Sequence, residues 1–190
     1  MAQLARWRAD GTVPDDFVMT ANVSARQLQQ GFAQEVAEIL RVADVPGAAM
    51  GLEVTETALI NDPSLAASVI AELRALKIGF LLDDFGTGYS SLTHLQRFPL
   101  DAVKLDRSFV ADIGPGKASI VEAVISIGDA LGLAVIAEGV ETRDQAQALL
   151  ELGCVCGQGY FFARPMSAEK FEAHLLSAAE PSGARDGLVS

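Results

Sequence analysis

The feature that most constrains the fold is a continuous apolar segment that ends in two carboxylates. Residues 78–82 read Ile-Gly-Phe-Leu-Leu, and Asp83 and Asp84 follow directly. A short apolar run of this kind, bounded by polar residues, is typical of a strand in a parallel sheet that helices cover on both faces. We therefore expect a parallel sheet, with Asp83 and Asp84 at the carboxyl end of one of its strands.

Helical and strand-like patterns alternate along the rest of the chain. The six expected strands are residues 17–23, 50–54, 78–83, 102–105, 134–138 and 159–162. Helix starts are expected at Asp62-Pro63, at Ser167, and at the capping-box pairs Ser24 with Gln27, Ser119 with Glu122 and Thr142 with Gln145. A short helix is expected at residues 90–96. This alternation predicts an α/β fold with a parallel sheet.

The composition fits one globular domain. Of the 190 residues 50% are apolar, which is enough to bury a core, and the small and polar residues 177–190 are expected to form a disordered tail. The net charge of −11 argues against a surface for duplex nucleic acid. No apolar run reaches the roughly 18 residues of a membrane helix, and the N-terminus carries no signal-like core. We therefore expect a cytoplasmic protein.

Cysteine and histidine residues carry little functional signal in this chain. Cys154 and Cys156, the two cysteines, are too few for a disulfide framework and are expected to be reduced packing residues. His94 and His174 are expected to be surface or interface residues rather than metal ligands.

Polar side chains stand at the expected strand ends. They are Asn22, Glu53, Asp83 with Asp84, Lys104 and Glu138, with Gln158 just before the last strand. In a parallel α/β barrel the carboxyl ends of all strands meet at one mouth. An open doubly wound sheet would spread the same residues along an edge. Because residues from six successive strands converge more easily in a barrel, we favour the barrel.

These strand-end residues predict a metal site. Four of them are carboxylates: Glu53, Asp83, Asp84 and Glu138. Placed together they would repel one another, and divalent ions would relieve that repulsion. Oxygen ligands, including the Asn22 amide, suit Mg²⁺ or Mn²⁺, and two such ions can stabilise the attacking and leaving oxygens of a phosphodiester. Lys104 adds a cation that could hold a phosphate or orient water. Any one carboxylate could instead be a helix cap, but buried charges normally have partners.

At these positions the sequence resembles the EAL-domain phosphodiesterases, which hydrolyse cyclic di-GMP. The matching segments are Asn-Val-Ser at 22–24, Glu-Val-Thr-Glu at 53–56, Asp-Asp-Phe-Gly-Thr-Gly-Tyr-Ser-Ser-Leu at 83–92, Lys-Leu-Asp-Arg-Ser-Phe-Val at 104–110, Ala-Glu-Gly-Val-Glu at 137–141 and Gln-Gly-Tyr at 158–160. The resemblance implies a TIM-like (β/α)₈ barrel whose domain spans residues 1–176.

The resemblance also implies a metal-ligand set. Asn22, Glu53 and Asp83 correspond to ligands of one ion, Mg²⁺ or Mn²⁺. Asp83 would bridge to a second ion, which Asp84 and Glu138 also hold. The implied reaction is attack of metal-activated hydroxide on one phosphodiester of cyclic di-GMP, which yields linear pGpG.

Further roles follow from the same resemblance. Lys104 is implied to contact the catalytic water and the phosphate, and it forms the catalytic set with Asp83 and Glu138. The implied supporting residues are Gln158 at the mouth of the site, Glu141 and Asp106 behind it, and Glu56 as the anchor of the loop 86–91. In the family this loop reaches the dimer interface, so a homodimer is expected.

The chain departs from the family in one respect. It has no Glu-Ala-Leu motif, and only six of the eight strands of a TIM-like barrel are visible. We therefore expect the first two strands to be missing, together with one metal-ligating Glu and one ligand-contacting Arg. The barrel could then not close within the chain, and two strand edges would be exposed. A fragment or gene-model truncation, a domain completed by a partner, and a degenerate relative all fit this pattern.

Three functions remain open from the sequence. The chain could be a cyclic di-GMP phosphodiesterase, whole or as the C-terminal part of one. It could be a non-catalytic module that binds cyclic di-GMP or mediates dimerisation. An unrelated metal-dependent barrel hydrolase is the third possibility, supported only by the general logic of two-metal sites.

Overall fold

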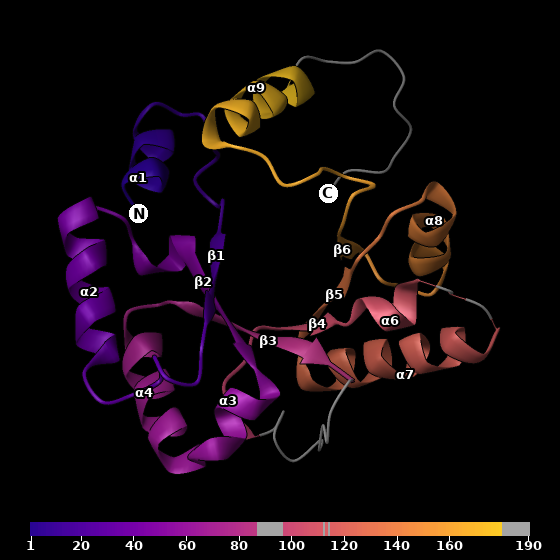
Figure 1. The fold of residues 1–190 in the computed structure, drawn as a ribbon, viewed down its shortest axis with the longest axis horizontal. Coiled ribbons are helices and arrows are strands. Elements are labelled where there is room, and N and C mark those ends of the chain that lie inside the picture. The colour runs from indigo at the N-terminus through magenta and orange to yellow at the C-terminus, as the bar shows by residue number, and fades with distance from the viewer. Residues whose placement is uncertain (87–96, 112, 114, 180–190) are drawn as a thin grey trace.

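The computed structural model of the chain describes residues 1–86, 97–111, 113 and 115–179, in which helices and strands alternate (Figure 1). The strands are β1 (Met19–Val23), β2 (Met50–Thr55), β3 (Gly79–Phe85), β4 (Ala102–Leu105), β5 (Ala134–Glu138) and β6 (Cys156–Gln158). The helices are α1 (Ala2–Ala9), α2 (Phe32–Ala43), α3 (Glu56–Asn61), α4 (Pro63–Ala75), α6 (Arg107–Val110), α7 (Pro115–Leu131), α8 (Arg143–Glu151) and α9 (Ala168–Ala179), with a 3₁₀ turn at Gly47–Ala49.

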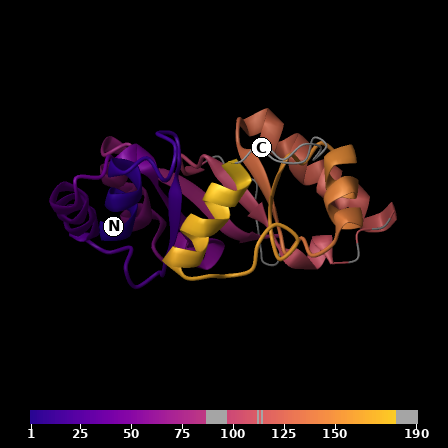
Figure 2. The ribbon, with the colours of Figure 1, turned by 90° about the horizontal axis from the view of Figure 1, so that it is seen from above.

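The strands form one parallel sheet in the order β1-β2-β3-β4-β5-β6. Each strand pairs with the next one in the sequence, as the strand–helix alternation predicts, and the sheet curls into an open half-barrel (Figures 1 and 2). In the described residues β1 and β6 each have a neighbour on one side only. The expectation of two exposed strand edges therefore agrees with the sheet order.

The core lies where the sequence predicted a strand covered on both faces. Phe80 and Leu82 of β3 are 0% and 2% exposed, and the intervening Leu81, whose side chain points to the opposite face, is 9% exposed. Helices α2 and α4 pack on this core through apolar side chains, among them Leu40 and Leu73. Within the described residues, no helix combines the length and the apolar character that crossing a membrane requires.

Most element boundaries agree with the sequence prediction. Strands β4 and β5 match the expected ranges, α4 begins at the Asp62-Pro63 pair, and Asp62 accepts a hydrogen bond from the Leu65 N–H at 3.0 Å. The capping box of Thr142 and Gln145 is present at the start of α8. The expected helix at 90–96, with His94, lies outside the described residues, and α9 extends to Ala179, past the start of the expected tail.

Two predicted helix starts are wrong. Ser24 and Gln27 close a turn in which the Ser24 N–H donates to Gln27 Oε1 at 3.0 Å, and α2 begins only at Phe32. The intervening Gly31 has a φ of 94°, a left-handed conformation that interrupts a helix. Ser119 lies inside α7, which begins at Pro115 because proline's fixed φ suits the first helical position.

The last predicted strand is also misplaced. β6 spans Cys156–Gln158, and residues 159–162 form a turn in which the Phe162 and Ala163 N–H groups both donate to the Gly159 carbonyl. Gly159 packs so closely on the backbone of Val140 that a Cβ there would lie 2.1 Å from the Val140 carbonyl oxygen. Backbone contact, rather than side-chain alternation, therefore ends this strand. Cys154 is buried, whereas Cys156, expected to pack, is exposed on the edge strand, and neither forms a disulfide.

The two ends of the described chain are joined by one carboxylate. Glu172 on α9 accepts hydrogen bonds from Trp7 Nε1 at 2.6 Å and Gln3 Nε2 at 3.2 Å, and it pairs with Arg6. The Trp7 and Phe171 rings lie 5.1 Å apart between centroids. Helix α9 is thereby attached to α1, and Figure 1 shows it passing across the open side of the sheet.

Replacing Glu172 with Ala should loosen this attachment. Three donors lose their shared acceptor, so we expect a lower urea midpoint and a red shift of the fluorescence of Trp7, the single tryptophan. Hydrogen bonds from Trp7 and Arg6 lower the pKa of Glu172. In the wild type this contribution to stability is therefore present at neutral pH and is lost as the pH falls through that lowered pKa.

The matched control is E169A on the same helix, because the Glu169 carboxylate interacts with Ser167 rather than with Trp7. Emission that shifts equally in both variants, or in neither, would contradict the proposed attachment.

Candidate metal centre at the carboxyl ends of the strands

A buried lysine gathers carboxylates from three strands. Lys104 on β4 is 4% exposed. Its Nζ lies 2.6 Å from Glu53 Oε2 on β2, 2.6 Å from Glu138 Oε1 on β5 and 3.1 Å from Asp83 Oδ1 on β3. The sequence-predicted catalytic residues Lys104, Asp83 and Glu138 are therefore brought together, with Glu53 beside them.

Strand register explains this convergence. Asn22 on β1 pairs with Glu53 on β2, and Glu138 on β5 pairs with Gln158 on β6. Asp83 pairs with Thr55, two positions beyond Glu53, so it lies further toward the carboxyl end of the sheet. Because all strands run in parallel, these side chains lie at the same end of the half-barrel.

An irregularity in β3 turns two consecutive carboxylates toward one place. Side chains of a regular strand alternate between faces, which would separate Asp83 from Asp84. Here the register with β4 shifts between Leu82 and Phe85, and Asp84 has a φ of 56°, which is uncommon for a residue other than glycine. Such bulges re-aim side chains. Ligand atoms of Asp83, Asp84 and Glu138 consequently lie within 4.8 Å of one another.

Electrostatics couple the lysine to this cluster. Burial alone would lower the pKa of Lys104, but its hydrogen bonds to Glu138 and Glu53 outweigh burial and raise that pKa above its ordinary value. Burial raises the pKa of Glu138, and the charges of Asp83 and Glu53 act in the same direction, against the lowering effect of Lys104. The lysine therefore stays charged, and Glu138 binds a proton more readily than a free glutamate.

The cluster has the donors that a hard divalent cation requires. Asp83, Asp84 and Glu138 offer oxygen atoms at one point, which suits Mg²⁺ or Mn²⁺. Asp83 Oδ1 is buried and is paired with Lys104 Nζ at 3.1 Å, but it has no further partner in the described residues, so one of its lone pairs is left for a cation. Asn22 and Glu53 lie side by side on the neighbouring strands, where they could extend the ligand set.

The supporting residues predicted from the sequence fall in different places. Glu56 is buried at the first position of α3. Asp106 caps α6, its carboxylate accepting from the Ser108 N–H at 2.9 Å, and the Glu141 N–H donates to Gln145 Oε1 at 2.7 Å beside the start of α8. These contacts hold helix termini. Of the loop 86–91, only Gly86 lies in the described residues.

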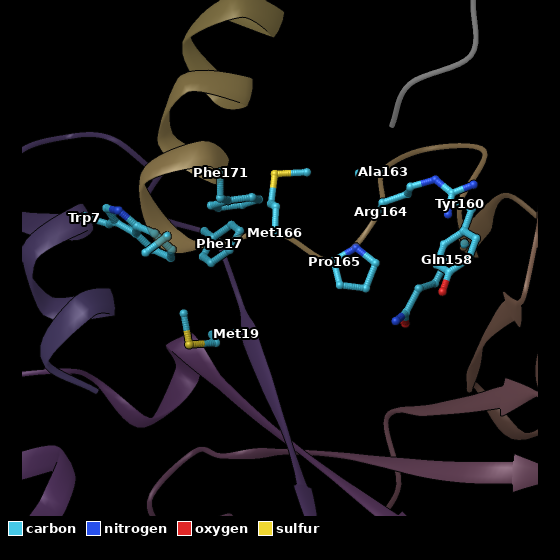
Figure 3. A pocket seen from close by; sticks show the side chains of 12 residues that line it. Trp7, Phe17, Met19, Gln158, Tyr160, Ala163, Arg164, Pro165, Met166 and Phe171 are labelled. Carbon is cyan, nitrogen blue, oxygen red and sulfur yellow. The ribbon is translucent and has the colours of Figure 1, made fainter.

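A groove that sequence reasoning missed lies between the two ends of the sheet. Its volume is about 570 Å³, and it is lined by Trp7, Phe17, Met19, Gln158, Gly159, Tyr160, Ala163, Arg164, Pro165, Met166, Ala168 and Phe171. In Figure 3, Trp7 and Phe17 lie on one side and Tyr160 on the other. The Arg164 guanidinium lies over the Tyr160 ring, 4.5 Å from its centroid. Because these residues come from opposite ends of the chain, no local motif indicates the groove. Of the predicted site residues Gln158 alone lines it.

Comparison with known proteins decides the family. The model of the EAL domain matches residues 1–165. The chain belongs to the EAL-domain family. The cyclic di-GMP phosphodiesterase PA2567 of Pseudomonas aeruginosa is 42% identical over 175 residues, which cover 90% of this chain and 29% of that protein. The chain thus spans less than a third of the length of that relative.

Solved EAL structures share the fold. The EAL domain of Mycobacterium smegmatis DcpA superposes with a TM-score of 0.88 at 38% identity, over 95% of this chain and 82% of that one. BlrP1 of Klebsiella pneumoniae, in a complex with manganese and cyclic di-GMP, superposes with a TM-score of 0.78 at 30% identity, over 86% of this chain and 42% of that one. The predicted TIM-like α/β architecture is confirmed, with six strands in the described residues.

Replacing Lys104 with Met should destabilise the protein when divalent ions are chelated. The variant leaves Glu53, Asp83 and Glu138 without their shared cation, and breaking a buried ion pair in this way costs about 3 kcal/mol or more of unfolding free energy. The loss should shrink as the pH falls through the raised pKa of Glu138, because protonation removes one of the repelling charges. Urea unfolding in EDTA across this pH range measures both effects.

The control is K170M, since Lys170 is exposed on α9, where a substitution changes stability by about 0.5 kcal/mol or less. A K104M variant as stable as K170M would show that the lysine is not needed to neutralise the cluster.

Proposed function

We propose that this chain is the catalytic part of a metal-dependent phosphodiesterase that hydrolyses cyclic di-GMP to linear pGpG. The observation that carries the proposal is the convergence of Asp83, Asp84 and Glu138 within 4.8 Å of one another, beside the buried Lys104. The names of the phosphodiesterase PA2567 and of the BlrP1 complex support the choice of substrate and of a divalent ion. Mg²⁺ and Mn²⁺ both fit the oxygen donors.

Most of the side chains in the site would hold metal ions. Two divalent ions, once bound, would supply Lewis-acid stabilisation of the attacking and leaving oxygens of the phosphodiester. Asp83, Asp84 and Glu138 would hold these ions, with Asn22 and Glu53 completing the set from β1 and β2.

Lys104 has a distinct part in this proposal. Its raised pKa keeps the amino group protonated at neutral pH, so it cannot act as the general base. It would instead contact a phosphate oxygen, on which negative charge develops as the reaction proceeds, and orient the attacking water.

The cellular location, the dimer, the nucleotide contact and the domain bounds are part of the same proposal. A bacterial EAL phosphodiesterase acts in cytoplasmic signalling. The chain would form a homodimer through the region of the loop 86–91, with Glu56, buried at the start of α3, as the anchor of that loop. Gln158 would contact the nucleotide at the mouth. Residues 1–176 would form the catalytic domain.

One observation favours a second candidate, a module that binds cyclic di-GMP without hydrolysing it. In the described residues the sheet stays open between β1 and β6, so the ring of strand ends has polar residues on six strands rather than the eight of a closed barrel. An incomplete ring could hold the phosphates through Lys104 and a single ion and still lack turnover.

Incubation with cyclic di-GMP and Mn²⁺ tests both candidates. Wild-type protein should form pGpG, and D83N should form it at least about 100-fold more slowly, because metal stabilisation of transition-state charge amounts to several kcal/mol. D129N is the control, since Asp129 is an exposed residue of α7. Calorimetric binding of the dinucleotide without pGpG would favour the second candidate, and neither binding nor product would overturn both.

A further inference from the structure

Helix α6 contacts the first residues after β3 and after β5, the two strands that carry the acidic cluster. It follows β4 directly, three residues after Lys104. Its first turn is fixed by the Asp106 cap at 2.9 Å from the Ser108 N–H, and the Asp106 N–H donates to the Phe85 carbonyl at 3.4 Å. At its other end, Gln145 Nε2 of α8 donates to the Ala111 carbonyl at 3.2 Å. The helix is therefore held from both sides.

One contact joins α6 to the loop after β3. Gly86 comes two residues after Asp84 and has a φ of 98°. A Cβ added there would lie 2.7 and 2.9 Å from two ring carbons of Phe109. The ring of Phe109 therefore packs directly against the backbone of Gly86, just after the bulge at Asp83 and Asp84.

A second contact joins α6 to the loop after β5. Gly139 directly follows Glu138 and has a φ of 67°. A Cβ there would lie 2.5 Å from Arg107 Cβ and 3.4 Å from Arg107 Cα. The backbone of α6 therefore contacts Gly139, the residue that follows Glu138. In the same way, the Phe109 ring contacts Gly86, two residues after Asp84.

We infer that α6 is a spacer that sets the distance between Asp83-Asp84 and Glu138. Phe109 and Arg107 are the residues that position these carboxylates for metal binding. This inference rests on the proposed metal-dependent function. A metal site tolerates little error in ligand geometry, and the left-handed backbone of Asp84 needs support from its surroundings to persist. Contacts of α6 with both flanking loops supply that support.

Matched glycine substitutions separate this role from simple backbone strain. Gly31 and Gly132 have φ values of 94° and 69°, close to those of Gly86 and Gly139, but a Cβ at either would meet nothing within 4 Å. G86A and G31A should therefore strain the backbone alike, as should G139A and G132A. Only in G86A and G139A would the added Cβ clash with a residue of α6. On calorimetric titration of the full chain with Mn²⁺, we expect these two to bind at least about tenfold more weakly, and the two controls to bind within about twofold of wild type.

Substitutions in α6 test the same contact from the other side. F109A removes the ring from Gly86, whereas V110A truncates the next residue, which is fully buried but points into the core. F109A should weaken Mn²⁺ binding and V110A should not, although both lower the urea midpoint. F109L, which keeps most of the apolar volume, replaces F109A if that variant does not fold. The double variant G86A/F109A should lose less affinity than the product of the single losses, because the ring that clashes with the new Cβ is gone.

The outcomes separate this inference from the proposed function. If wild-type protein, G86A, G139A and F109A all bind Mn²⁺ with the same affinity, the spacer role is overturned and the proposed function is unaffected. Wild-type protein that binds neither Mn²⁺ nor Mg²⁺ would overturn both. Weaker binding in these variants, with unchanged binding in G31A, G132A and V110A, supports the spacer role.

Discussion

A single buried ammonium group holds the functional end of this protein together. Carboxylates from β2, β3 and β5 meet within 3.1 Å of Lys104 Nζ. Without a cation these charges would repel one another and drive their strand ends toward solvent, and a buried charge without a partner is strongly destabilising. The lysine lies on β4, with β2 and β3 on one side and β5 on the other, so its place in the sheet brings all three carboxylates within reach of its ammonium group. Fold stability and chemistry therefore depend on the same four side chains.

The acidic cluster also depends on departures from regular structure. A regular β3 would place Asp83 and Asp84 on opposite faces. The register shift and the left-handed Asp84 bring both to one point, and the short helix α6 contacts the loops on either side. These features cost backbone free energy, which the large core around β3 offsets. A rigid scaffold thus supports a locally strained site.

Much of this arrangement could be predicted from the sequence, and the reasons are local. Apolar runs that end in polar residues predicted five strands and the positions of their carboxyl ends. Because those ends meet in a parallel sheet, Glu53, Asp83, Lys104 and Glu138 could be predicted to lie together. What could not be predicted depends on contacts across the chain. Gly31 moved the start of α2, and packing of Gly159 on Val140 turned the expected last strand into a turn. The contacts of Phe109 and Arg107, and the groove lined from both chain ends, leave no periodic signal.

The joining of the two ends by Glu172 has a consequence for how the chain folds. Every strand pairs with its successor, so the sheet can grow one neighbour at a time from any starting point, and each added strand closes a modest loop. The bond between Trp7 and Glu172 spans 165 positions. During synthesis the N-terminal strands can associate while later ones are still being made, but this bond forms only after residue 172 has left the ribosome. Until then the Trp7 indole N–H lacks that acceptor, so α9 can be attached to α1 only after every strand of the sheet has been synthesised.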